Sequence, residues 1–154
     1  PKDGQVYAAG LNGWNGGGRK GLSQGHIHRF RYTGEPARLL EDVQVKKNGI
    51  ELAFNFKLDS KSAIDPKTYA LEQWDYKWSR GYGSREYLPG TDKTGREKIK
   101  IGKVTLAPDG KTVHLSIDAI KPVNQMKIEL NLEATDGKPF EDMAYLTINR
   151  VPSE

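Results

Sequence analysis

Short runs in which apolar and polar residues alternate dominate this sequence of 154 residues. Such a period of two is typical of β-strands with one buried face. Gly, Pro, Asn and Asp interrupt the runs at short intervals, as expected of turns between strands. No segment keeps an apolar stripe of period 3.6 for three turns, which a helix packed on a core would need. The pattern therefore predicts an all-β protein.

The first two predicted strands form an N-terminal segment of their own. Residues 4–10 give one strand and residues 26–32 give the other, with a long glycine-rich loop at 12–25 between them. Alternation places His26 and His28 on the same face of the second strand. We therefore expect residues 1–35 to form a two-stranded extension.

A more regular series of runs extends from residue 38 to residue 150 and predicts about seven strands. The Asn48-Gly49 pair joins two alternating runs and predicts a hairpin. Residues 99–106 are predicted as one strand with a bulge at Gly102, where the inward phase slips. One-sided strands at this spacing favour an immunoglobulin-like antiparallel β-sandwich over residues 36–154, with a closed barrel as the alternative.

Composition excludes several classes of site. The chain has 24 Lys and Arg against 20 Asp and Glu, and the resulting charge of +4 is too small and too evenly spread to predict nucleic-acid binding. The chain has no cysteine, which excludes thiolate zinc sites, iron–sulfur clusters and cysteine nucleophiles. No apolar run is long enough to cross a bilayer. Because the sequence starts at Pro1 and shows no signal peptide, we expect a processed product or an excised fragment.

Two parts of the sequence resemble a known family of large secreted proteins. Residues 4–7 (GQVY), 10–14 (GLNGW) and 28–34 (HRFRYTG) resemble the closing strands of a β-propeller. That propeller occurs in proteins related to sorbosone and glucose dehydrogenases, many of which also carry haem c domains. The remainder looks like the C-terminal Ig-like module that follows the propeller, through residues 48–50, 58–59, 65–69, 73–78, 82–84, 122–128 and 147–149.

The resemblance implies a secreted or periplasmic setting and an adjacent propeller-type oxidoreductase domain. Its motifs are structural, and no catalytic residue is carried over from the family. Haem attachment needs a Cys-x-x-Cys-His motif, which a chain without cysteine cannot supply. The resemblance therefore implies an accessory module without a cofactor of its own.

An aromatic row is the most distinctive local feature. If the strand that begins at Tyr69 continues, Trp74, Tyr76 and Trp78 share its outward face. Rings about 6–7 Å apart on alternate strand positions can stack on successive sugar rings. Arg80 and Tyr82, with Asp75, could bind sugar hydroxyls. Two other interpretations stay open: the rings form a small second core, or they belong to a protein–protein interface.

The residue types also allow catalytic or metal-binding arrangements. His26 and His28 have the spacing of a two-histidine metal site on a strand, but a third ligand is missing, and His114 is expected to point outward elsewhere. The acids Asp75, Glu86 and Asp92 surround one loop and could form a glycosidase pair. The serines in glycine-rich loops, at positions 23, 79 and 84, lie outside any Gly-x-Ser-x-Gly elbow. We predict no metal and no catalytic residue.

The sequence therefore predicts a non-catalytic accessory module that packs against or spaces a neighbouring domain. The first alternative is a carbohydrate-binding module that uses the aromatic row, with a polysaccharide as ligand. The second is a small hydrolase or metalloenzyme. We expect no membrane insertion, and the open edges of the N-terminal hairpin also allow a strand-exchanged dimer.

Overall fold

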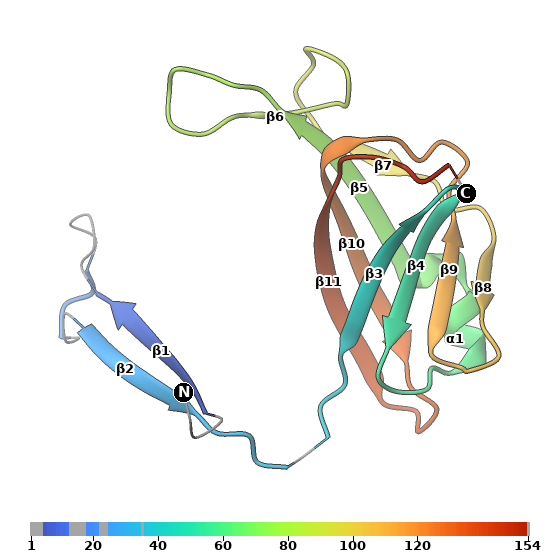
Figure 1. Ribbon diagram of the computed structural model, residues 1–154, viewed down its shortest axis with the longest axis horizontal. Helices are drawn as coiled ribbons and strands as arrows, with labels where there is room; N and C mark the ends of the chain where they lie inside the picture. The colour runs from blue at the N-terminus through green and yellow to red at the C-terminus, as the bar shows by residue number, and fades with distance from the viewer. Residues whose placement is uncertain (1–4, 13–17, 22–24, 35, 154) are drawn as a thin grey trace. The chain divides into compact units, whose positions relative to one another are not determined.

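The computed structural model describes residues 5–12, 18–21, 25–34 and 36–153, and the chain separates into two units, Pro1–Ala37 and Arg38–Glu154 (Figure 1). In the first unit, β1 (Val6–Leu11) pairs antiparallel with β2 (Gly25–Phe30) in an unbroken register of six residue pairs. The predicted pair of N-terminal strands is therefore present. Trp14 and Ser23, which the sequence brought to notice, lie outside the described residues.

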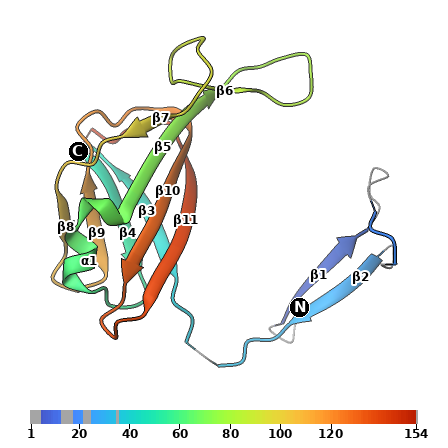
Figure 2. The same cartoon turned by 180° about the vertical axis from the view of Figure 1, so that it is seen from behind.

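The second unit is an antiparallel β-sandwich, as predicted, and its two layers are seen from opposite sides in Figures 1 and 2. One sheet has the order β3-β4-β9-β8, and its strands are Leu40–Lys46, Gly49–Phe54, Thr112–Ser116 and Val104–Leu106 respectively. The other has the order β11-β10-β5, where β11 is Pro139–Ile148, β10 is Val123–Glu133 and β5 is Tyr69–Tyr76. The far edge of β5 pairs with two short strands, β7 (Glu97–Ile99) and β6 (Glu86–Tyr87).

The core lies between the two sheets and follows the alternation of the sequence. Inward residues of β4 and β9 meet those of β10, while the residues between them face outward. The fully buried side chains of these three strands are Ile50, Leu52, Val113, Leu115, Met126, Ile128 and Leu132.

The predicted hairpin joins β3 to β4, but its turn lies one residue earlier than expected. Lys46 pairs with Gly49, so Lys47 and Asn48 form the turn and Gly49 opens β4. A Cβ atom at Gly49 would lie 1.9 Å from the backbone oxygen of Leu115 on β9. Glycine is therefore required here by the close approach of two strands as well as by its own backbone angle φ of +155°.

The prediction of one strand over residues 99–106 is wrong. Ile99 ends β7 in one sheet, and Val104 begins β8 in the other, so the chain changes sheets between them. Gly102 donates its N–H to Ser116 O (2.8 Å), and Ser116 donates to Lys103 O (2.9 Å), which directs the chain onto β9. The slip of the inward phase at Gly102 marks this crossing. The predicted single strand is therefore two strands, β7 and β8. This is one reason why residues 38–153 contain nine strands instead of the predicted seven or so.

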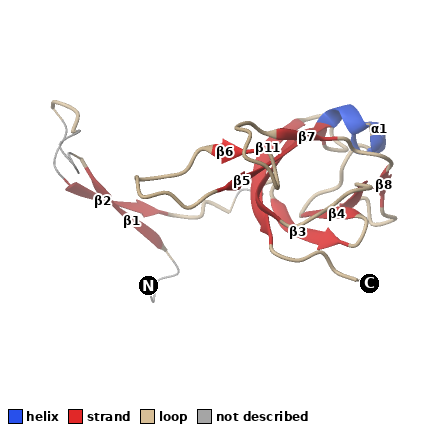
Figure 3. Cartoon of the chain, turned by 90° about the horizontal axis from the view of Figure 1, so that it is seen from above, coloured by secondary structure: helices blue, strands red, loops and turns tan. Residues whose placement is uncertain are grey.

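Sequence reasoning also missed a short helix. In α1 (Ser60–Ile64), the Asp59 carboxylate caps the N-terminus by accepting from the N–H groups of Lys61 and Ser62. Five residues are too few to show a helical period. α1 contacts both β8 and β10 and closes one open side of the sandwich (Figure 3), and a 3₁₀ turn at Pro66–Thr68 leads into β5.

Tyr69 connects this helix to the core. Its hydroxyl donates to Ala63 O at 2.7 Å, and burial raises its pKa above the ordinary value of 10.0. We expect Tyr69→Phe to lower the free energy of unfolding by about 1–3 kcal/mol, because the carbonyl of Ala63 loses its partner. Urea unfolding, with the exposed Tyr82→Phe as control, measures this difference.

The same burial predicts an alkaline loss of stability. Because the pKa of Tyr69 is higher in the folded chain than in the unfolded chain, its neutral hydroxyl contributes fully to stability below pH 10. This contribution decreases as the pH rises towards the folded pKa. The Tyr69→Phe chain should lack this component of the alkaline decline. Equal declines in the two chains would contradict the assignment.

Candidate functional site

The predicted site residues lie where the backbone pairing of β5 with β10 ends. Pairing with β10 stops at Trp74, while Asp75 and Tyr76 pair with β6. Two long loops, residues 77–85 and 88–96, project from this point past the end of the sandwich (Figure 1).

Asp75 and Asn124 fix the base of these loops. The Asp75 carboxylate accepts from the backbone N–H groups of Asn124 and Gly90, at 3.0 Å each. Asn124 in turn accepts from the N–H of Tyr76 at 2.8 Å. Asp75, which the sequence offers as a ligand for sugar hydroxyls, therefore holds β10 and the second loop to β5.

Short-range hydrogen bonds close the 77–85 loop on itself. The hydroxyl of Ser79 donates to Gly83 O at 2.9 Å, and that of Ser84 accepts from the N–H of Lys77 at 2.9 Å. Gly83 has a φ of +81°, which glycine adopts without strain. Lys77 also forms an ion pair with Asp92 of the second loop, and its ammonium lies 4.8 Å from the centre of the Tyr87 ring. The two loops are therefore tied to each other.

Bulky aromatic and cationic side chains project from the 77–85 loop. Trp78 is 89% exposed and Tyr82 is fully exposed. Arg80 and Arg85 are exposed too, and neither side chain has an ion-pair partner among the described residues. Beside them lies a hollow of about 420 Å³ whose lining consists of Lys77, Trp78, Ser79, Tyr82, Gly83, Ser84, Arg85 and Tyr87.

The ring of Trp74 is not open to solvent, whereas the predicted aromatic row required an open ring. It lies on the outward face of β5 as predicted, but only 2% of it is exposed. The guanidinium of Arg96 lies 4.1 Å from the centre of the Trp74 ring, and the rings of Tyr76 and Tyr145 pack edge-on against it. A row of three open rings is therefore absent. Tyr76 is about half exposed, so the open surface shifts to Trp78 and Tyr82.

Ion pairs hold the guanidinium of Arg96 over the Trp74 ring. Its Nε and Nη2 donate to the two carboxylate oxygens of Glu86 at 2.7 and 2.8 Å, and Nη1 approaches Glu72 at 3.4 Å. This hydrogen-bonded pair lowers the pKa of Glu86 below its ordinary value of 4.5. Sequence reasoning missed Arg96 because it lies far from Trp74 along the chain and carries no local signal.

The Arg96–Glu86 pair predicts a fall in stability at acid pH. A folded pKa below the unfolded one stabilises the protein above the unfolded pKa, and this contribution is lost as the pH falls through the folded pKa. Both side chains are more than one third exposed, so the expected loss is about 1 kcal/mol or less. Urea unfolding of the wild type and of Glu86→Gln, at neutral pH and at about pH 3, checks this. An equal loss in the Glu86→Gln chain would contradict it.

The three acids around the loops are all engaged. Asp75 accepts backbone N–H groups, Glu86 pairs with Arg96, and Asp92 pairs with Lys77, which lowers the pKa of Asp92. The sequence placed them in one region correctly, but each carboxylate has a structural partner.

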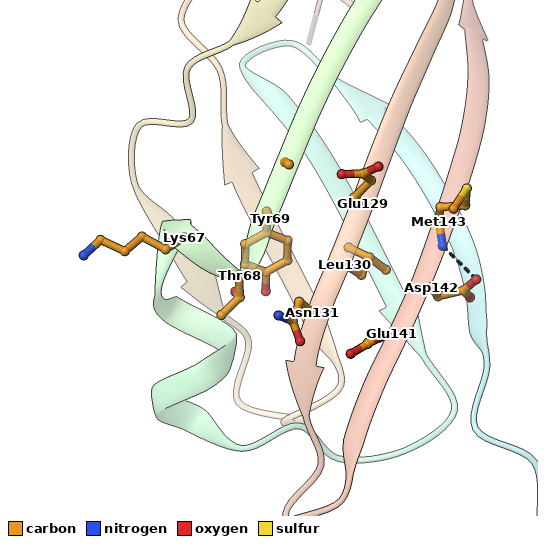
Figure 4. A pocket seen from close by; sticks show the side chains of 10 residues that line it. Lys67, Thr68, Tyr69, Glu129, Leu130, Asn131, Glu141, Asp142 and Met143 are labelled. Carbon is orange, nitrogen blue, oxygen red and sulfur yellow. Dashed lines mark hydrogen bonds between the residues drawn. The ribbon is translucent and has the colours of Figure 1, made fainter.

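A second hollow, of about 620 Å³, lies on the outer face of β5, β10 and β11 (Figure 4). Its side chains do not converge on one point: Lys67 points away, and the Tyr69 hydroxyl is bonded to Ala63. The Asp142 carboxylate accepts from the N–H of Met143 at 2.8 Å. No pair of acids is arranged around a nucleophile there, so the 77–85 loop remains the stronger candidate.

The histidines belong to other strands than the candidate site. The rings of His26 and His28 meet edge-on with centres 4.4 Å apart on β2, while His114 is on β9. Among the described residues no group of three or more His, Asp or Glu side chains is arranged to hold a metal ion. Within that same part of the chain, no helix has the length and apolar character to cross a membrane.

Comparison with known proteins adds no identity. No family model matches the chain, and no curated protein matches it. The functional argument therefore depends on the geometry of the site itself.

Proposed function

We propose that this chain is a non-catalytic accessory module that docks onto an adjacent protein domain through the 77–85 loop. The observation that carries the proposal is the near-complete exposure of Trp78 and the full exposure of Tyr82 on a projecting loop that also holds Arg80 and Arg85. Trp, Tyr and Arg are the residue types most enriched at the energetic centres of protein interfaces. Ordered aromatic side chains also lose little conformational entropy on binding.

The arrangement of the loop supports this role. Its internal hydrogen bonds and the Lys77–Asp92 pair hold the backbone before any partner arrives, which reduces the entropy lost on binding. The carboxylates nearby are bound to structural partners, so they are not set up for acid–base catalysis.

We further propose that the sandwich is Ig-like. In the nomenclature of that fold, the order β3-β4-β9-β8 corresponds to A-B-E-D, and β11-β10-β5-β7 corresponds to G-F-C with an added C′ strand. The 77–85 loop is then the connection from strand C to C′, at the end of the sandwich opposite to the B–C, C′–C″ and F–G loops that antibody variable domains use for binding. The family resemblance suggests a secreted or periplasmic protein whose adjacent domain is a propeller-type oxidoreductase.

Photo-crosslinking in the polypeptide that carries the module tests the docking surface. A benzophenone amino acid at position 78 should crosslink to a peptide of the adjacent domain, and mass spectrometry identifies that peptide. The control position is Lys98, which is exposed on β7 away from the loop. If position 78 yields no more protein crosslinks than position 98, the docking role is wrong.

Carbohydrate binding is the second candidate, because the hollow at the 77–85 loop combines three aromatic residues, Trp78, Tyr82 and Tyr87, with the hydroxyls of two serines. Sugar sites commonly join a stacking ring to hydrogen-bonding groups. Titration with neutral and acidic polysaccharides, followed by iodide quenching of tryptophan fluorescence, separates the two candidates. Saturable protection that disappears in Trp78→Ala supports a sugar site, whereas unchanged quenching favours docking onto protein.

A further inference from the structure

The positive charge of the sandwich unit is concentrated in its two projecting loops. Residues 77–96, which hold both loops and β6, contain five cations and two anions. The rest of residues 38–153 contains 14 cations and 15 anions, so the unit is slightly acidic without this segment. A net charge of +3 on a short projecting segment attracts an anionic surface and repels a cationic one.

Both anions of this segment are already engaged within it. Asp92 and Glu86 each form an ion pair with a cation of the same segment. The cations left over are Arg80, Arg85 and Lys93. All three are exposed, and none has an ion-pair partner in the part of the chain that the structure describes. The loops therefore present three cations that no carboxylate of the described residues neutralises.

The hollow of about 420 Å³ at the 77–85 loop contains positive but no negative side chains. None of its eight lining residues is acidic, whereas Lys77 and Arg85 both belong to the lining. Because Lys77 pairs with Asp92, the guanidinium of Arg85 is the cation open to a ligand there. The hydroxyls of Ser79 and Ser84 already donate to backbone carbonyls of the loop, at 2.9 and 2.7 Å, so their protons are engaged. A guanidinium beside aromatic rings favours a carboxylate, which accepts two parallel hydrogen bonds from it.

We propose that the 77–85 loop binds an acidic patch of the adjacent protein domain, and that an Asp or Glu side chain of this patch enters the hollow and pairs with Arg85. This inference rests on the proposed docking role and specifies the chemistry of the partner. Arg80 and Lys93 pair with further carboxylates at the rim, while Trp78 and Tyr82 supply the apolar contact. A protein is the source of the carboxylates, because Trp, Tyr and Arg together dominate the energetics of protein interfaces.

Carbodiimide crosslinking tests the pairing, because it joins an amine only to a carboxylate in direct contact with it. In the polypeptide that carries the module, Arg85→Lys keeps the positive charge at the hollow and adds the amine that arginine lacks. We expect isopeptide bonds from this position, and from the natural Lys93, to Asp or Glu residues of the adjacent domain. Mass spectrometry should find them about fivefold more often than those from Lys98, the exposed control on β7.

Removal of the charge gives a second readout. Arg85→Gln should lower the yield of benzophenone crosslinks from position 78 to the adjacent domain about fivefold, because the carboxylate in the hollow loses its partner. Lys98→Gln is the matched control, since it removes the same charge from β7 and should leave this yield unchanged.

The outcomes separate this inference from the docking role. If the Arg85→Lys chain forms no more isopeptide bonds at that position than at Lys98, while benzophenone at position 78 still reacts with the adjacent domain, the carboxylate pairing is wrong and docking stands. If benzophenone at position 78 fails as well, both are wrong. Titration of the chain with polygalacturonate covers the other source of carboxylates. Saturable protection of tryptophan from iodide that Arg85→Gln abolishes, without isopeptide bonds to protein, would overturn the proposal in favour of an acidic polysaccharide.

Discussion

Replacement of Trp74 with alanine should lower the free energy of unfolding by about 3–5 kcal/mol, because the largest ring on the outer face of β5 is almost completely buried. The same replacement at Trp78, four residues later, should change it by no more than about 0.5 kcal/mol. Urea unfolding followed by circular dichroism measures both. The two tryptophans share a predicted strand face, so the difference separates a structural ring from a ring that is available for binding.

Trp74→Phe refines this comparison. The indole N–H of Trp74 is buried without a hydrogen-bond partner, so its removal leaves no group unpaired, and Phe should lose less stability than Ala. A Trp78→Ala chain as unstable as Trp74→Ala would show that the 77–85 loop folds back onto the sandwich, and both functional proposals would then lose their main support.

Gly49→Ala is expected to lower the free energy of unfolding of the sandwich by about 3 kcal/mol, which is the upper end of the range for an overpacked site. The new Cβ atom would meet the backbone oxygen of Leu115 at 1.9 Å, and no rotation of a side chain relieves a clash with backbone. The neighbouring strands β4 and β9 would have to separate at the position where they pair. The midpoint of thermal or urea unfolding measures the loss.

Gly81→Ala is the matched control for this substitution. Gly81 has open space around it and lies in the 77–85 loop, so its replacement should leave the unfolding midpoint within error of the wild type. If Gly49→Ala is equally harmless, the two strands move apart more easily than their hydrogen-bonded register suggests.

The sequence predicted the core well because the period of two is a direct consequence of strand geometry. Met126, Ile128, Leu130 and Leu132 alternate with polar residues along β10 after the irregularity between Val123 and Met126, and all four are buried. The same reasoning placed Trp74 on the outward face of β5, and this assignment of the face is correct.

A small second core was one interpretation of the aromatic row, but the side chains that cover Trp74 could not be predicted, because an outward residue is buried by whatever lies over it in space. Arg96 comes from the segment before β7, and Tyr145 comes from β11, and neither is a neighbour of Trp74 in the sequence. The change of sheets after Ile99 had a similar cause: periodicity reports which face of a strand is apolar, but not which sheet the strand joins. The candidate site therefore lies where the sequence predicted it, but its open rings are those of Trp78 and Tyr82, and the ring of Trp74 is buried.

The way in which the 77–85 loop is anchored has a consequence for how such a module diversifies. Asp75 and Asn124 hold its base, and Ser79, Ser84 and Lys77 close it from within, so the residues between them contribute no side chain to the core. Substitutions or changes of length at the tip leave the free energy of folding nearly untouched. Under the proposed docking role, recognition and folding would thus be encoded by separate residues of one β-strand connection. A single sandwich could acquire new specificities by changing this loop alone, in the way that antibody domains vary their hypervariable loops on a constant framework.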